Sequence, residues 1–529
     1  MNGVARRCIA VVFAAALAVV LGPALAAAPL APEEAAGRAI FQSGKSSYGD
    51  AFSGRLGIAQ QQVPGMAVRC ANCHGPDGLG RPEGGVHPSN ITWSELTKSY
   101  GHTHENGRRH ATFDEASLRR AITEGVDPAG NQLDGVMPRF NISERDFKSL
   151  VAYLKKLEFE RDPGVGADTL RLGTLLPLTG RFGELGLAVR GILQAYIDRI
   201  NQGGGIYGRR LELVVAEYAD DRAATRLALR KLINEDDVFA LLSPFAAGVE
   251  DDLSRLANEA KIPVVGPLSL FGDDPHANNQ YVFRLLSGVA ELAEVLAQHV
   301  GREADVKARA AVLLHPDSAE GAGVADAVEA QLKSQGWTQI SRIGFRPGEL
   351  AAAAVAKTLQ ERAAEAVFVL GPGADIGALA REAAKSTQLP QLLLPGSLAP
   401  RTVLDLPQAY ESRILLAYPT IPSDQKPDAL REYANLFRDH SLARGHQTLQ
   451  VPAYSSAILL VEVLKRVGRD LTRQKLVSTL ESIQGFEPGL IPAVSFNANR
   501  RIGAPGGYVV GLDLEHKNFR RLGGFVQLP

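Results

Sequence analysis

Along this 529-residue chain, the pattern of apolar and polar positions changes character near residue 165. Before that point, helical periodicity is clear in two segments. Pro32–Phe41 opens with proline and acidic residues, which favour a helix start. In Ser143–Leu157 apolar residues recur every three or four positions behind Ser143, an expected N-cap. After residue 165, short apolar runs alternate with amphipathic helices. The pattern predicts a small helical domain followed by a larger α/β domain.

The larger region contains two series of alternating strands and helices. The first is expected to comprise Leu170–Leu176, Leu185–Ile200, Leu211–Val215, Ala223–Leu232, Val238–Leu242, Val249–Ala260 and Ile262–Val265, and the second Ala310–Leu314, Gly323–Gln335, Leu350–Arg362, Ala366–Leu370, Ile376–Lys385 and Gln391–Leu394. Such alternation predicts parallel sheets flanked by helices. Two series indicate two lobes, with a ligand expected at the carboxyl ends of the strands between them. We find no nucleophile elbow or phosphate loop here, so we do not expect an enzyme.

The run Cys70-Ala71-Asn72-Cys73-His74 carries the clearest chemistry in the chain. Cys-x-x-Cys-His is the covalent attachment signature of a c-type haem, in which both thiols form thioethers and the histidine becomes an axial iron ligand. The alternatives are a redox dithiol, half of a zinc site or a structural disulfide. The chain has only three cysteines, and Cys8 lies in a segment that we expect to be removed. This count favours the haem.

Residues 1–28 have the pattern of an export signal. Arg6 and Arg7 precede an apolar stretch, Cys8–Leu21, and Ala24–Ala26 offers a cleavage site. An uncleaved membrane anchor is the alternative, but the apolar stretch is shorter than the ~20 residues that a spanning helix needs. We expect a periplasmic protein that does not span the membrane after cleavage.

Length and charge narrow the remaining possibilities. A chain of 529 residues is too long for one core, so two or three domains are expected. The 57 basic and 58 acidic residues give a net charge of −1, without a basic stripe. We therefore expect no nucleic-acid partner.

The second axial ligand of the iron is argued by elimination. The chain has three methionines: Met1 leaves with the signal, and Met66 is too close to Cys70 to reach the opposite haem face easily. Met137 stands in an irregular segment before Pro138, which suits a ligand loop. The alternative is a methionine that fills a gap in the core. We expect Met137 to bind the iron.

A group of histidines, His102, His104 and His110 with His87 nearby, is the main rival for that role. A His-x-His pattern can bind a metal or replace methionine on the iron. The alternative is a solvated polar loop, as the flanking Gly101 suggests.

Several motifs together resemble a class I cytochrome c. They are Gly37 and Phe41 in the first helix, Cys70-x-x-Cys-His74-Gly75, Met137-Pro138 and Tyr153-Leu154 in the last helix. The resemblance implies a domain at residues 33–158 with one covalently attached haem c. Cys70 and Cys73 would be the thioether links, His74 the proximal ligand and Met137 the distal one. The insertion between Gly44 and Gly65 is longer than in the family's simplest members.

The larger region resembles the type I periplasmic solute-binding proteins of the branched-chain amino-acid (leucine-binding) group. The matching motifs are Leu172-Gly173-x-x-x-Pro177-Leu178-Thr179-Gly180, Ile200-Asn201-Gln202-Gly203-Gly204-Gly205-Ile206-x-Gly208-Arg209, Asp220-Asp221 and Lys261-Ile262-Pro263-Val264-Val265-Gly266-Pro267. The resemblance implies two Rossmann-like lobes joined by a multi-stranded hinge. The domain would span residues 169–529, with residues 159–168 as a linker.

The ligand pocket implied by this resemblance departs from the amino-acid binders. Ala247 stands where a serine would be expected, and Glu320 where a tyrosine would be. Ser269 keeps a hydroxyl, and Phe182 matches the aromatic residue at the side-chain end of the ligand. Without partners for its charges, a zwitterion would be bound poorly. We expect an apolar or differently charged metabolite, or a pocket no longer used for uptake.

Together these features predict an exported monohaem cytochrome fused to a small-molecule-binding domain. The first hypothesis is an electron carrier that serves a periplasmic dehydrogenase or oxidase. A second is a substrate-binding protein for an ABC permease, taking amino acids or related metabolites, with the haem as sensor or tether. A third is a haem peroxidase, which would need an open iron site that Met137 would close.

Overall fold

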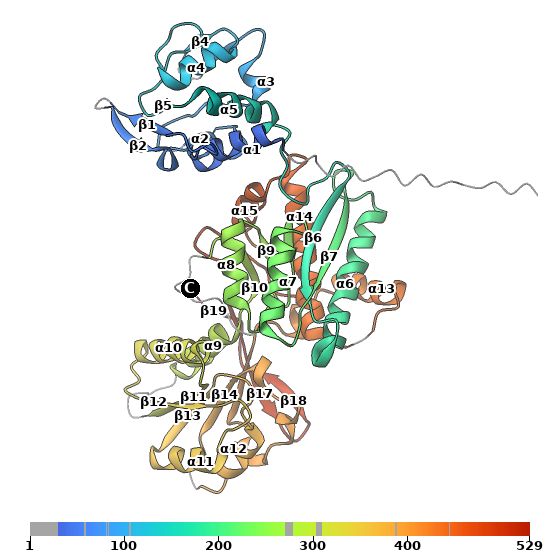
Figure 1. The fold of residues 1–529 in the computed structure, drawn as a ribbon. Coiled ribbons are helices and arrows are strands. Elements are labelled where there is room, and N and C mark those ends of the chain that lie inside the picture. The colour runs from blue at the N-terminus through green and yellow to red at the C-terminus, as the bar shows by residue number, and fades with distance from the viewer. Residues whose placement is uncertain are drawn as a thin grey trace, which may run out of the picture. The chain divides into compact units, whose positions relative to one another are not determined.

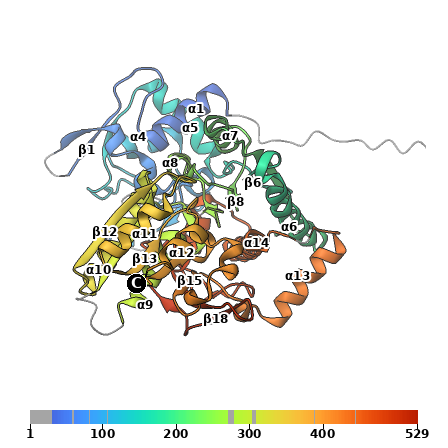
Figure 2. The same ribbon diagram turned by 90° about the horizontal axis from the view of Figure 1, so that it is seen from below.

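The structure is a computed structural model that describes residues 30–528, apart from 58–59, 81, 83, 105–106, 270–278, 303–308, 387–388 and 444. The chain divides into two compact units, Met1–Glu160 and Arg161–Pro529 (Figure 1, Figure 2). The expected export signal at residues 1–28 lies outside the described residues. Within the described part of the chain, no helix combines the length and apolar character needed to cross a membrane.

In the first unit, the first and last helices pack against each other (Figure 1). They are α1 (Pro32–Arg38), which continues into the π-helical turn η1 (Ala39–Ser43), and α5 (Glu144–Leu157). A Cβ atom on Gly37 would lie 2.0 Å from the Ser149 carbonyl oxygen and 2.7 Å from Tyr153 Cβ. Only glycine lets the two helices approach this closely. The rings of Phe41 and Tyr153 lie 5.6 Å apart at the same crossing.

The apolar stripe expected on α5 is buried in the core of this unit. Its members are Phe147, Leu150, Val151, Leu154 and Leu157. Ser143 caps the helix, because its hydroxyl oxygen accepts the Asp146 N–H at 3.1 Å. The periodicity of the sequence therefore predicted both the helix and its buried face.

The first unit also contains short strands that the sequence did not predict. A three-stranded antiparallel sheet has the order β2 (Gln61–Pro64), β1 (Ser53–Leu56), β5 (Arg139–Asn141), and β3 (His102–Thr103) pairs with β4 (Arg109–His110). The helices α2 (Cys70–His74), α3 (Trp93–Leu96) and α4 (Glu115–Thr123) complete the unit. The expected all-helical domain thus gains a small sheet from the insertion between Gly44 and Gly65. This sheet is held by the pairing of β1 with β5 and by the stacking of Phe52 on Phe140, with ring centres 5.3 Å apart. Both contacts join distant segments, so no local sequence pattern predicts the strands.

The second unit has two lobes, each built on one sheet. The first sheet is parallel, with the order β16 (Ile502–Ala504), β10 (Val282–Leu286), β9 (Val264–Val265), β8 (Ala240–Leu242), β6 (Thr169–Leu176), β7 (Arg210–Glu217). Its lobe contains α6 (Gly183–Gln202), α7 (Arg222–Asn234), α8 (Glu250–Ala260), α13 (Pro427–Asp439), α14 (Gln447–Val467) and α15 (Arg473–Glu481). In Figure 1 this lobe combines green and orange-red segments, which are far apart in the sequence.

The second sheet has the order β12 (Gln339–Phe345), β11 (Ala310–Pro316), β13 (Ala364–Val369), β14 (Gln391–Pro395), β15 (Ile414–Tyr418), β17 (Gly506–Asp513), β18 (Asn518–Arg521), with β19 (Val526–Gln527) beside β17. Its lobe contains α9 (Val289–Val300), α10 (Ala319–Ser334), α11 (Ala352–Glu361) and α12 (Ile376–Ala383). The chain passes between the sheets after β10, after β15 and after β16. Two lobes with a multi-stranded connection are what the sequence predicted.

The expected linker at residues 159–168 is anchored to the second unit along its later part. The Asp162 carboxylate accepts the backbone N–H of Arg473, and the Gly164 N–H donates to Asp237 Oδ1 at 3.1 Å. Gly164 has φ of +81°, and a Cβ atom there would lie 2.3 Å from the Phe239 nitrogen. Glycine is therefore required where this segment joins the lobe.

Candidate functional sites

The first unit encloses a cavity of about 780 Å³, within the range usual for cofactor sites. Cys70, Cys73 and His74 of α2 line it, together with Met137 from the loop before β5. Many of the other lining side chains are apolar: Phe41, Phe52, Ile91, Leu96, Leu118, Ile122, Phe140, Leu150 and Leu154. The fold thus brings the four predicted haem residues from two distant segments to one apolar cavity, which is the environment that a porphyrin requires.

Cys70 and Cys73 form no disulfide with each other. Burial, together with the charge of the nearby Cys73, raises the pKa of Cys70 to about 12. A redox dithiol or a zinc thiolate instead requires a thiol whose pKa is lowered. The environment of Cys70 is therefore unlike that of a catalytic dithiol, and its apolar walls fit thioether attachment to a haem.

His74 is held by a backbone carbonyl. Its Nδ1–H donates to the Ser89 oxygen at 2.8 Å, which leaves Nε2 as the free nitrogen. Such a hydrogen bond on the outer nitrogen fixes the tautomer and the ring orientation of a metal-ligating histidine. Burial lowers the pKa of His74, although the Ser89 hydrogen bond opposes the shift. A neutral imidazole with a free Nε2 is the form that binds iron.

Met137 lies in a loop that Arg139 holds in place. The Arg139 guanidinium donates to the Met137 carbonyl at 2.6 Å and to the Leu133 carbonyl at 2.8 Å. Gly125, with φ of +74°, makes room for it, since a Cβ atom there would lie 1.9 Å from Arg139 Nε. Met66 is 56% exposed and does not line the cavity. Of Met66 and Met137, only Met137 lines the cavity and is placed to serve as a ligand.

His102, His104 and His110 also line the cavity and stand close together. The His104 and His110 Nε2 atoms are 2.9 Å apart, and the His102 and His104 ring centres are 4.4 Å apart. Burial, followed by the charges of Arg108, His102 and His110, lowers the pKa of His104 to about 4. His87 lines the same cavity. The histidines that the sequence singled out are therefore part of this site and are not a separate surface loop.

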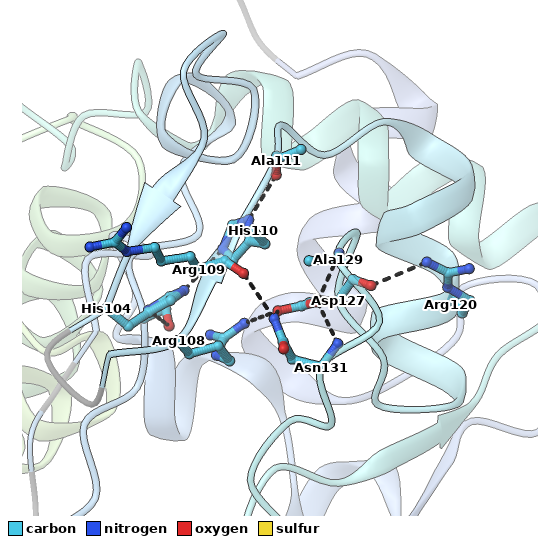
Figure 3. Close-up of polar contacts among 10 residues, drawn as sticks. His104, Arg108, Arg109, His110, Ala111, Arg120, Asp127, Ala129 and Asn131 are labelled. Carbon is cyan, nitrogen blue, oxygen red and sulfur yellow. Dashed lines mark hydrogen bonds and ion pairs between the residues drawn. The ribbon is translucent and has the colours of Figure 1, made fainter.

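A buried carboxylate, Asp127, supports this histidine group (Figure 3). Its Oδ2 accepts Arg108 Nη1–H at 2.7 Å and the Asn131 side-chain N–H at 2.9 Å, while Oδ1 accepts the backbone N–H groups of Ala129 and Asn131. Burial alone would raise the pKa of Asp127, but these hydrogen bonds hold it below its usual range. The sequence analysis missed this residue. Its place in Asp127-Pro128-Ala129-Gly130, a turn sequence, is the only local signal.

In the second unit, the predicted ligand residues lie at strand ends. Phe182 follows β6, and its ring lies 5.8 Å from that of Phe245, after β8. Tyr218, directly after β7, contacts Phe245 with ring centres 4.9 Å apart and donates its hydroxyl proton to the Ala247 carbonyl at 2.7 Å. The fold therefore brings Phe182 and Ala247 together around the rings of Phe245 and Tyr218. The sequence analysis did not identify Tyr218 and Phe245 as residues of this site.

The other two predicted residues are separated. Ser269, after β9, contacts Arg284 Nη1 at 2.6 Å, whereas Glu320 is exposed at the start of α10 in the second lobe. Glu250, the first residue of α8, is only 7% exposed. Burial raises the pKa of Glu250 to about 7, the Arg284 charge opposes the shift and the Glu320 charge adds to it. Glu250 and Arg284 were missed because neither belongs to a local motif.

Comparison with known proteins places both units. Residues 169–516 match the periplasmic binding protein family, and residues 65–158 match the cytochrome c family. A Leu/Ile/Val-binding protein homologue of Brucella melitensis is 27% identical over 40% of this chain and 57% of its own length. The chain thus spans little more than half the length of this curated relative.

Solved structures show the fold of the second unit. A branched-chain amino acid transporter protein of Thermus thermophilus with bound valine has 17% identity and a TM-score of 0.55, over 68% of this chain and 96% of its own. A fatty acid ABC transporter substrate-binding protein of Thermomonospora curvata also has 17% identity and a TM-score of 0.55, over 70% and 95%. The chain therefore belongs to the periplasmic binding protein family over residues 169–516, and it carries a cytochrome c domain ahead of them, at residues 65–158.

Proposed function

We propose that this protein is an exported monohaem electron carrier whose second domain binds a small molecule. A cytochrome c domain implies a covalently bound haem c, which supplies one-electron redox chemistry when bound. The observation that carries the proposal is the single cavity lined by Cys70, Cys73, His74 and Met137. Among the described residues, this is the place where two thiols, an oriented imidazole and a thioether meet.

The chain's own residues would divide the work at this site. Cys70 and Cys73 would hold the haem covalently, and the His74 imidazole and the Met137 thioether would be the groups available to its iron. Ser89 orients His74, and Arg139 fixes the loop of Met137. A domain that offers both an imidazole and a thioether to the iron would favour electron transfer over reaction with peroxide. The partner would be a periplasmic dehydrogenase or oxidase.

The second domain would bind a small molecule other than a free amino acid. The serine expected for carboxylate binding is Ala247, and the nearby buried Glu250 carries its own acidic group. A ligand carboxylate placed beside Ala247 would lack the serine hydroxyl and would lie near the acidic Glu250. In the family, delivery to an ABC permease is the usual context, so this role is the second candidate; the Leu/Ile/Val-binding relative favours it.

Two measurements on the purified haem-containing protein test the proposal. Reversible one-electron titration with one haem per chain supports the carrier function; a haem that reacts with peroxide at a catalytic rate contradicts it. Thermal shift with amino acids, short acids, alcohols, aldehydes and amides, in both redox states, tests the second domain. A ligand that binds more tightly in one redox state must shift the haem potential reciprocally. Equal binding in both states favours independent modules and the transport role.

A further inference from the structure

We propose that the ligand of the second unit is a small organic amine, bound as its ammonium ion by a group of aromatic rings and the carboxylate of Glu250. The inference rests on the small-molecule-binding role proposed above and names the chemical class of the ligand. The aromatic group consists of Phe182, Tyr218 and Phe245, which follow the strands β6, β7 and β8 of the first sheet. The carboxyl ends of parallel strands are where open α/β sheets bind their ligands.

Glu250 is a buried acid with an acceptor that the protein leaves unused. The residue is only 7% exposed, and its buried Oε1 atom accepts no hydrogen bond from the residues that the structure describes. Such an oxygen has lost its hydrogen bonds to water and has gained none from the protein, which is unfavourable. A ligand that brings an N–H donor to Glu250 would satisfy this oxygen.

The turn before α8 brings Glu250 to the aromatic group. The Tyr218 hydroxyl donates to the Ala247 carbonyl at 2.7 Å, only three residues before Glu250. The charge of Glu250 adds to the burial that raises the pKa of Tyr218, as expected of an acid near this ring. Between them, Gly248 has φ of +77°, and a Cβ atom there would meet nothing within 4 Å. The acid and the rings therefore belong to one site, beside a turn with open space.

The aromatic rings favour a cationic ligand. The Arg181 guanidinium lies 4.5 Å from the centre of the Phe182 ring, so one ring of the group already contacts a cation within the protein. The negative face of an aromatic ring attracts ammonium groups in the same way, and more strongly where water is excluded. Phe245, whose ring lies 5.8 Å from that of Phe182, is only 7% exposed. An ammonium ion beside these rings would gain from contact with their faces.

The charges near Glu250 come from both lobes. Glu320, at the start of α10 in the second lobe, adds its negative charge to the surroundings of Glu250. Arg284 is the opposing charge, and its guanidinium donates to Ser269 Oγ at 2.6 Å. Without a ligand, the like charges of Glu250 and Glu320 repel each other. An ammonium ion beside Glu250 would be attracted by one acid from each lobe and would remove this repulsion.

Other ligand classes would gain less at this site. An alcohol would also donate a hydrogen bond to Glu250, but a charge-assisted hydrogen bond is roughly twice as strong as a neutral one. A carboxylate would lie near the acids Glu250 and Glu320 and would be repelled by both. Three probes that share one ring separate these classes: benzylamine, benzyl alcohol and benzoate.

The test is calorimetric titration of the full-length haem-containing protein with the three probes at pH 8, above the pKa of about 7 of Glu250. Benzylamine should bind at least about 10-fold more tightly than benzyl alcohol, and benzoate more weakly than either. Glu250→Gln removes the charge and keeps the shape. It should weaken benzylamine binding by about 10–100-fold and change the affinity for benzyl alcohol by less than about 3-fold. The matched control is Glu259→Gln, since Glu259 is an exposed acid of the same helix that pairs with Arg255.

Benzylamine binding by a folded Glu250→Gln variant equal to that of the unmodified protein would overturn the inference. Should this variant not fold, Glu320→Gln, which changes an exposed side chain, is read in its place; it should weaken benzylamine binding by about 2–5-fold, and an unchanged affinity would overturn the inference. Binding of benzoate, benzyl alcohol or another class of compound without binding of benzylamine would reject the amine and keep the small-molecule-binding role. Binding of no compound, in this set or in the thermal-shift panel, would reject both.

Discussion

The two candidate sites of this protein are built in opposite ways. The haem cavity takes three of its four key groups from five consecutive residues, Cys70–His74, and the fourth from the Met137 loop. The residues singled out in the second unit are spread over strand ends of one lobe, such as Phe182, Tyr218 and Ser269, with Glu320 on the other lobe. The first kind of site can be read from a motif. The second kind can be located by the fold, but its chemistry depends on single residues that belong to no local motif.

This difference shows which properties of a site can be inferred from resemblance to a family. Covalent attachment fixes residue types, because two thiols and a histidine at set spacing are needed whatever partner the cytochrome serves. A solute-binding lobe fixes only where the ligand lies, at the carboxyl ends of the strands. An alanine in place of the expected serine at position 247 would alter the contacts to a ligand without disturbing the sheet.

Removing the covalent links should have the largest effect. The double variant Cys70→Ala, Cys73→Ala lacks both thioether sulfurs, so haem should be lost entirely from the denatured chain. Haem staining after denaturing electrophoresis measures this. The second unit should still melt as in the parent protein, because it has its own core. Loss of both transitions would show that the second unit depends on the haem-bearing one.

Substitution of Met137, the proposed iron ligand, should have the second largest effect. Met137→Ala should abolish the weak long-wavelength absorption band of methionine-bound ferric haem and lower the reduction potential, because the thioether favours reduced iron. Met66→Ala is the matched control, since Met66 is exposed and outside the cavity. An unchanged band in Met137→Ala, or a lost band in Met66→Ala, would contradict the assignment.

Substitution of one helical glycine in each unit tests how tightly the helices of the two units are packed. Gly37→Ala should destabilise the first unit by about 1–3 kcal/mol, because its Cβ atom would overlap the backbone of α5. Gly323→Ala in α10 meets nothing within 4 Å and should stabilise its helix by up to about 1 kcal/mol. Calorimetric unfolding, with haem absorbance as a local probe, measures both. Equal effects at the two positions would refute the close crossing of α1 and α5.

The smallest expected effect concerns Glu250 and pH. Burial raises its folded-state pKa from the ordinary 4.5 to about 7, so the folded state holds the proton more tightly than the unfolded chain. The free energy of unfolding should therefore be greatest below about pH 4.5 and fall as the pH rises through about 7, by on the order of 1–3 kcal/mol. Denaturant unfolding across this range should be flatter for Glu250→Gln.

Glu259→Gln, at the exposed end of the same helix, should keep the slope of the parent protein. A slope that persists in Glu250→Gln would assign the pH dependence to another group and would show that Glu250 is solvated.

Much of the fold could be predicted from periodicity. The alternation after residue 165 gave the helices α6, α7, α8, α10, α11 and α12 and the strands β6, β7, β8, β9, β11, β13 and β14, and the stripe on α5 was predicted residue by residue. The sequence analysis missed elements whose apolar runs are short or do not stand out from the flanking sequence. The strand β10 and the helices α13–α15 lie where no clear alternation precedes them, and β1 and β2 depend on pairing with a distant strand.

The sequence by itself determined the chemistry of covalent attachment, the order of the two domains and the architecture of the second one, because consecutive residues and helical or strand periods encode them. The sequence already favoured Met137 over Met66, but only the tertiary structure decided that Met137 lines the cavity of Cys70, Cys73 and His74. Only the tertiary structure decided that Ser89 holds His74, that Arg139 holds the Met137 loop, and that three histidines stand together in the cavity. These facts depend on distances between segments far apart in the chain. Such distances follow from packing around a common core, and no local pattern records them.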